Sequence, residues 1–169
     1  MAVSQSTEYA RRPATADGTT ERVSPTRRPE PAATPRLGGI AGATHALLRI
    51  GAGLLFFMHG APKLFGWFGG MGPEGGSAEL VSLMGLAGVL EVFGGLLIAL
   101  GFLTRPVAVV LALEMLIAYF RAHAPQGPIP YTNGGELALL YFCVWAYLAG
   151  NGAGPLSVDR RLRTEPNRR

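Results

Sequence analysis

Four long apolar blocks, separated by short polar or glycine-rich connections, fill most of the chain after residue 45. They cover about residues 46–67, 81–101, 105–121 and 134–149. Because a helix rises ~1.5 Å per residue, roughly 20 residues cross a hydrocarbon core of ~30 Å. The pattern therefore predicts an all-α integral membrane protein, built as a four-helix bundle.

The connections between the blocks contain residues that end or begin helices. Residues 69–80 are rich in glycine and residues 122–132 contain three prolines, so neither segment is expected to continue a helix. Thr104 is a predicted N-cap of the third block. Asn133, followed three residues later by Glu136, predicts a capping box at the start of the fourth.

The two ends of the chain differ from its centre in composition. Residues 1–42 contain almost no large apolar side chains and cannot bury enough surface to offset their ordering entropy, so we predict a disordered tail. They also lack the apolar stretch of a cleavable signal peptide. Residues 157–169 form a second tail, polar and basic, which leaves residues 43–156 as the predicted membrane domain.

The distribution of charge predicts an orientation. Only 15% of the residues are charged, against about 25% in soluble domains. Most arginines flank the first and last blocks, and Arg105 lies in the connection between the second and third. Since such residues collect on the cytoplasmic side, we expect both termini to be cytoplasmic. This arrangement also explains the net charge of +4, and we expect no nucleic-acid partner.

Several kinds of site are disfavoured by the residues present. Cys143 is the only cysteine, so the chain cannot form an internal disulfide or a cysteine-rich metal site. Its apolar neighbours predict a small buried side chain. No HExxH, Walker or GxSxG motif occurs, and we predict no metal site.

Four ionisable side chains fall at membrane depth, where a charge is costly and needs a partner. Helical rise places them below the outer surface by ~12 Å for His59, ~6 Å for Lys63, ~15 Å for Glu91 and ~9 Å for Glu114. All four are therefore expected in the outer half of the bundle. They are our candidates for a substrate or polar-cluster site, with no catalytic residue assigned.

The faces of the predicted helices suggest partners for these residues. His59 and Lys63 are one turn apart on the first helix. Glu91 belongs to a stripe of small residues that also contains Ala87, Gly95 and Ala99. Small residues let helices approach closely, so we expect Glu91 to meet Lys63 and His59 across this interface. Glu114 shares a face with Arg121 and is expected to pair with it. Two interpretations stay open: pairs that fix the helix register, or a functional polar site.

Other polar residues have simpler interpretations. Arg49 lies near the inner interface and is expected to extend to the lipid head groups. His45 is expected at the surface, and His123 is expected to be solvated on the outer loop. A capping role accounts for Glu136 without any chemistry. Arg49, Asn133 and Glu136 are therefore secondary candidates.

A series of short motifs over residues 46–162 resembles the DoxX family of small bacterial membrane proteins. The motifs, in order, are Arg49-Ile50-Gly51, His59-Gly60-Ala61-Pro62-Lys63-Leu64, Gly88-Val89-Leu90-Glu91, Gly101-Phe102-Leu103-Thr104-Arg105, Asn133-Gly134-Gly135-Glu136 and Gly152-Ala153-Gly154-Pro155-Leu156-Ser157-Val158-Asp159. Each motif alone is weak, but their order and spacing together are specific. The resemblance implies four transmembrane helices in the bacterial inner membrane.

The resemblance implies less about activity. Some relatives are subunits of a thiosulfate:quinone oxidoreductase, others are tied to sulfur or oxidative-stress metabolism, and many have no assigned reaction. Our first hypothesis is a redox-linked membrane subunit without a cofactor of its own, which handles a quinone or an oxyanion such as thiosulfate. Lys63 and His59 would then bind the anion or a quinone oxygen, and Glu91 would relay a proton.

Two other hypotheses remain. The chain would be a non-catalytic scaffold that docks soluble sulfur-metabolism or oxidative-stress enzymes through its arginine-rich tails, or a small transporter. Whether the chain is an enzyme, and whether it forms a homo-oligomer, are left open.

Overall fold

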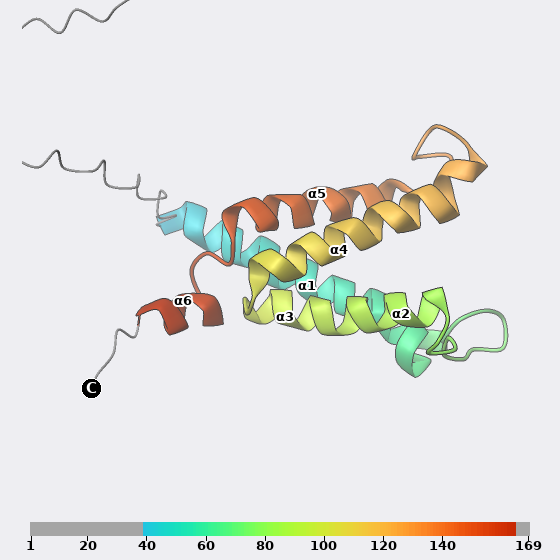
Figure 1. The fold of residues 1–169 in the computed structure, drawn as a ribbon, viewed down its shortest axis with the longest axis horizontal. Coiled ribbons are helices and arrows are strands. Elements are labelled where there is room, and N and C mark those ends of the chain that lie inside the picture. Colours follow the sequence, from blue (N-terminus) through green and yellow to red (C-terminus); the bar gives the residue numbers. More distant parts are fainter. Residues whose placement is uncertain (1–38, 165–169) are drawn as a thin grey trace, which may run out of the picture. The chain divides into compact units, whose positions relative to one another are not determined.

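The apolar blocks form a set of long helices in the computed structural model, which describes residues 39–164 (Figure 1). The long elements are α1 (Gly39–Phe65), α4 (Thr104–Ala118) and α5 (Glu136–Asn151). A further long helix is continuous through α2 (Leu83–Val89), η2 (Leu90–Gly94) and α3 (Gly95–Leu100). The short elements are η1 (Trp67–Gly69), η3 (Tyr119–His123), η4 (Ala124–Gln126) and α6 (Val158–Thr164). The described residues contain no strand, so the all-α prediction is confirmed.

Three of the helical segments are long and apolar enough to cross a membrane. They are Gly39–Phe65, Leu83–Leu100 and Thr104–Gln126. The fourth apolar helix, α5, has 16 residues and is therefore only about 24 Å long. It packs along α4 (Figure 1). The membrane character and the helical bundle are thus confirmed, and a complete crossing by α5 stays a prediction.

The interior and the exterior of the bundle are both apolar, as expected for a protein surrounded by lipid. Phe56 and Trp145 are fully buried, with ring centroids 5.0 Å apart, and Phe56 also packs against Tyr141 at 4.8 Å. Large apolar side chains such as Leu113 and Leu140 are nevertheless exposed on the outer faces. Cys143 is exposed as well, so the predicted buried position of this residue is wrong.

Glycines bring α1 against the second long helix, as the stripe of small residues predicted. A Cβ atom on Gly53 would lie 2.6 Å from the carbonyl oxygen of Gly95, and one on Gly60 would lie 2.7 Å from the Cβ of Glu91. A Cβ atom on Gly88 would lie 2.9 Å from the Cβ of Lys63. The backbones of the two helices therefore touch at these glycines, and this contact fixes the register of the two helices.

Arg49 ties together the helix ends on the side of the bundle that the sequence predicts to be cytoplasmic, which we call the inner ends; the opposite ends are the outer ends. Its side chain is fully buried, and it donates hydrogen bonds to the carbonyl oxygens of Ile98 at 2.7 Å, Ala99 at 2.5 Å and Leu156 at 2.8 Å. The expectation that Arg49 extends to lipid head groups is therefore wrong. The unsatisfied carbonyls at the end of α3 offer the guanidinium acceptors within the protein.

Asp159 completes this inner-end clasp. Its carboxylate accepts hydrogen bonds from the backbone N–H groups of Leu103 at 2.8 Å and Thr104 at 3.0 Å, which caps α4. Thr104 itself makes no capping bond, so its prediction as the N-cap is wrong. Asp159, 55 residues later in the chain, caps α4 instead. His45 is also buried here, against the hydroxyl of Tyr147 at 3.0 Å and the carbonyl oxygen of Gly152 at 3.1 Å, and not at the surface.

The predicted tails are partly helical in the structure. The first four residues of α1, 39–42, lie within the tail predicted to be disordered. At the other end, α6 occupies seven residues of the predicted basic tail. The remaining residues of the tail predictions, 1–38 and 165–169, lie outside the described part of the chain.

Candidate functional site

Two π-helical turns interrupt the long helices in the outer half of the bundle. One is η2, which contains Glu91, and the other is η3, which contains Arg121. A π-turn adds a residue to a helical turn and so changes which side chains face inward; such turns are frequent at functional sites. The turn in η2 buries Glu91 against α1 and leaves Ala87, which was predicted on the same interface, at the wall of a cavity.

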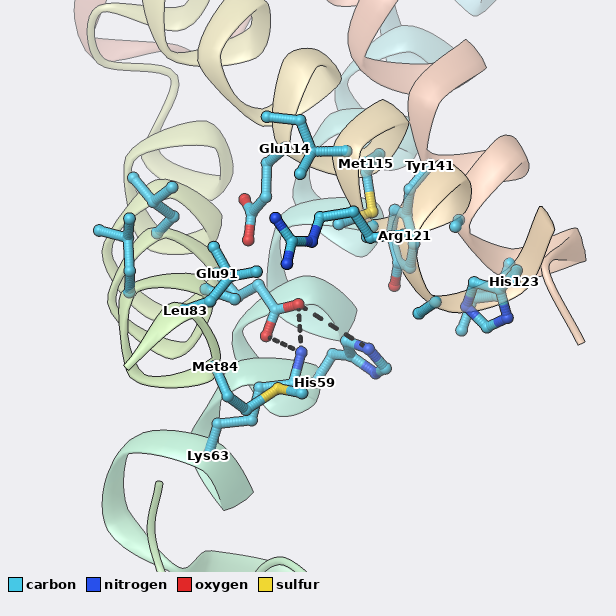
Figure 2. Close-up of a pocket in the computed structure, with 18 of the residues that line it drawn as sticks. His59, Lys63, Leu83, Met84, Glu91, Glu114, Met115, Arg121, His123 and Tyr141 are labelled. Atoms are coloured by element: carbon cyan, nitrogen blue, oxygen red, sulfur yellow. Dashed lines mark hydrogen bonds and ion pairs between the residues drawn. The ribbon is translucent and has the colours of Figure 1, made fainter. Parts of the chain in front are cut away.

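Glu91 is the centre of an ion cluster. The Nζ atom of Lys63 lies 2.6 Å from Oε1 and 2.7 Å from Oε2 of Glu91, a bidentate arrangement (Figure 2). The Nε2 atom of His59 lies 3.8 Å from Oε1. Glu91 is 1% exposed, whereas His59 is 46% exposed. The predicted pairing across the helix interface is therefore confirmed, and the role of these residues as a ligand site stays a prediction.

Glu114 lies at the same level of the bundle on the neighbouring helix. A Cβ atom on Gly94 would touch the Leu111 side chain at 2.7 Å, so these residues mark where the second long helix meets α4. Glu91 and Glu114 each lie three residues from that contact, on the same side of it. The two carboxyl groups are therefore closer in depth than the sequence predicted.

The Glu114 side chain makes no hydrogen bond in the described part of the chain. Its side chain is 9% exposed, and both of its carboxyl oxygens are buried without a hydrogen bond. The predicted pair with Arg121 is not formed; the Arg121 side chain extends into the same cavity (Figure 2). The Arg121 guanidinium lies on the same side of the cavity as the Glu114 carboxyl group (Figure 2), but no hydrogen bond joins the two side chains.

These residues line a cavity of about 790 Å³, a size typical of ligand sites. Most of its wall is apolar and comes from α2, η2, α4 and α5. The polar side chains that contribute to the lining are His59, Lys63, Ser82, Glu91, Glu114, Arg121, His123 and Tyr141. All four first-rank candidates therefore lie on one cavity.

The three secondary candidates do not line this cavity. Arg49 belongs to the inner-end clasp described above. Asn133 is buried in the loop, where its amide nitrogen donates to the Gly127 carbonyl at 2.8 Å and its amide oxygen accepts from the Gly135 N–H at 2.8 Å. Glu136 begins α5 but makes no capping bond, so the predicted capping box is not formed.

Sequence reasoning missed four polar contributors to the cavity, which are Ser82, Arg121, His123 and Tyr141. Tyr141 was not singled out because it occurs among many apolar residues of the fourth block. His123 was expected in solvent, but it lines the cavity and its Nδ1 lies 3.0 Å from the Asn133 carbonyl oxygen. Arg121 was considered only as a partner. Within residues 39–164, no cluster of three or more His, Cys, Asp and Glu side chains could hold a metal ion.

Comparison with known proteins supports the resemblance to the DoxX family. The sequence profile of the DoxX family matches residues 44–124. An uncharacterized protein of Haemophilus influenzae is 40% identical over 124 residues, which cover 69% of this chain and 89% of the relative. A Bacillus subtilis protein named "Putative oxidoreductase CatD" is 32% identical over 114 residues, covering 67% of this chain and 82% of the relative. No solved structure matches significantly. The chain is a membrane protein of the DoxX family.

Proposed function

We propose that this protein is a redox-linked membrane subunit whose cavity binds a quinone. The observation that carries the proposal is an apolar cavity at membrane depth that has the Lys63–Glu91 ion pair at one end. A quinone combines an apolar ring and tail with two carbonyl oxygens, and it is dissolved in the bilayer. The cavity offers apolar walls for the ring and a small number of polar groups for an oxygen, as ligand sites generally do.

The residues of the cluster suit particular steps. Reduction of a quinone to a quinol takes up two electrons and two protons. The Lys63 ammonium group can donate a hydrogen bond to the oxygen on which negative charge develops. Glu91 contacts Lys63 and the half-exposed His59, so a proton can pass from the outer side through His59 to Glu91. The electrons come from a separate reductant or partner subunit, such as an enzyme that oxidises thiosulfate.

The Bacillus subtilis relative supports the redox part of this proposal, because its name describes an oxidoreductase. The distribution of arginine supports the location in the bacterial inner membrane with both termini cytoplasmic. In that orientation the cavity and His59 lie in the outer half of the bundle. Protons would then be exchanged with the outer side.

Binding of a quinone tests the proposal directly. Trp145 stacks on Tyr141 with ring centroids 5.6 Å apart, and Tyr141 lines the cavity, so a bound quinone should quench the Trp145 fluorescence. The measurement uses a Trp67→Phe background in lipid nanodiscs, titrated with decylubiquinone or a short-chain menaquinone. We expect saturable quenching that the double variant Lys63→Met, Glu91→Gln weakens at least tenfold.

Glu136→Gln is the matched control, because it neutralises an exposed glutamate that does not line the cavity. Quenching that does not saturate, or that is equal in the double variant, would exclude this quinone site. Thiosulfate-dependent quinone reduction by membranes containing the protein separates the redox subunit from a scaffold. A scaffold would bring down soluble enzymes without binding quinone.

A further inference from the structure

The outer part of the cavity is open toward the lipid between two helices. The Gly94–Leu111 contact joins the second long helix to α4, and from there α2 and α4 diverge toward their outer ends (Figure 1). Exposed apolar side chains line both sides of the gap. They are Leu83 and Leu86 on α2, and Leu113 and Ile117 on α4. A cleft with such walls at membrane depth is in contact with acyl chains.

Glu114 lies at the inner end of this cleft as an unexplained buried polar group. Burial of a carboxyl group whose two oxygens make no hydrogen bond costs free energy in an apolar environment, and such groups are generally retained for a function. Lys63 does not satisfy it, because the ammonium group is already bound by both oxygens of Glu91. A ligand that completes the hydrogen bonds of Glu114 would remove this cost.

We propose that the quinone enters sideways from the bilayer between α2 and α4, and that Glu114 binds its second oxygen. This inference rests on the proposed function and extends it by an entry route and a second binding group. The first oxygen faces Lys63 and Glu91 on α1 and η2, and the second faces α4. The isoprenoid tail then remains in the cleft among the side chains of Leu83, Leu86, Leu113 and Ile117.

A carboxyl group suits both redox states of such a ligand. As an acid, Glu114 donates a hydrogen bond to a quinone carbonyl; as a carboxylate, it accepts one from a quinol hydroxyl. When two electrons arrive from the partner reductant, the Glu114 proton moves to the adjacent oxygen and an O–H bond forms. The second proton reaches the other oxygen through the Lys63–Glu91–His59 cluster, which balances the two-proton reduction.

Two pairs of variants test the inference by quenching of Trp145. Glu114→Leu removes the binding group and should weaken decylubiquinone binding about tenfold, whereas Glu114→Gln keeps a donor and should lose less. Glu136→Gln is the control. For the entry route, Leu113→Trp, which obstructs the cleft, is compared with Leu140→Trp on the lipid-facing side of α5, both with Trp67 replaced. Reference traces of each variant with Trp145→Phe added correct for the fluorescence of the introduced indole.

We expect Leu113→Trp to slow association of a long-tailed quinone at least several-fold, with little effect of Leu140→Trp. If the unmodified cavity binds quinone and both Glu114→Leu and Leu113→Trp bind it with unchanged affinity and rate, the inference is overturned while the proposed function stands. If the unmodified protein does not bind quinone, both are overturned. Circular dichroism of each variant separates loss of binding from loss of the fold.

Discussion

Both carboxylate oxygens of Glu91 contact the Nζ atom of Lys63, at 2.6 and 2.7 Å, so α1 and η2 are joined by a bidentate ion pair inside the bundle. Such a pair stabilises little relative to apolar residues of similar volume, but it is costly to break on one side. Single and double variants of Lys63 and Glu91 should therefore differ in stability, and this difference separates the pair's effect on the fold from its proposed role in quinone binding.

Removal of one partner should therefore be worse for stability than removal of both. We expect Lys63→Met to destabilise the protein by about 3 kcal/mol, because Glu91 is left buried and unpaired. The double variant Lys63→Met, Glu91→Gln should recover most of that loss while its quinone binding stays weak. Thermal unfolding of the four members of this cycle measures the coupling. Equal stability of the single and double variants would contradict a buried pair.

Close contact between α1 and the second long helix should be sensitive to a single methyl group. Gly53→Ala places a Cβ 2.6 Å from the Gly95 carbonyl oxygen, so the helices must separate and unfolding should occur at a lower temperature. Gly51→Ala is the matched control, because its new Cβ would meet nothing within 4 Å beyond the adjacent residues and the backbone of its own helix. That control should be neutral or stabilising by up to about 1 kcal/mol, since alanine favours the helix.

The inner-end clasp should be important for stability and unimportant for ligand binding. Arg49→Met leaves the carbonyls of Ile98, Ala99 and Leu156 without their donor, and we expect a loss of about 2–4 kcal/mol. Quinone affinity, measured at a temperature where the variant is folded, should be unchanged because Arg49 does not line the cavity. A variant of normal stability with weak binding would reverse this assignment.

The proposed orientation can be tested with single cysteines. Cys143 is replaced by serine, and one cysteine is introduced either at Glu74 in the connection after η1 or at Arg163 in α6. A membrane-impermeant maleimide added to intact cells should label the Glu74→Cys protein, and the Arg163→Cys protein only after lysis. The reverse pattern would place the cavity in the cytoplasmic half of the membrane.

The ion pair could be predicted from sequence, whereas the clasp could not. Lys63 and His59 are one turn apart at membrane depth, and Glu91 lies among small residues, so local spacing was sufficient to pair them. The acceptors of Arg49 are backbone carbonyls 49, 50 and 107 residues away. Every residue has a backbone carbonyl, so the sequence does not show which of them accept hydrogen bonds from Arg49. From sequence alone, a buried arginine of this kind therefore cannot be distinguished from one at the membrane surface.

The unpaired state of Glu114 was also beyond sequence analysis. Glu114 and Arg121 share a face of the predicted helix, but their spacing does not reveal whether the two side chains come within hydrogen-bond distance. The helix starts were misjudged for a related reason. Thr104 and Asn133 have the usual residue types for caps, but the loop geometry gives Asp159 the capping role at one helix and uses Asn133 to shape the loop at the other.

The clasp makes the two ends of the bundle mechanically unequal. Arg49 and Asp159 hold the inner ends of α3 and α4 and the segment before α6, while the outer ends of α2 and α4 diverge. The Lys63–Glu91 ion pair holds the second long helix against α1, so the gap between α2 and α4 can widen or narrow while the inner ends stay together. The width of the cleft would then be set by small tilts of α2 and α4 about their inner ends. A partner that binds the C-terminal segment would act close to that pivot.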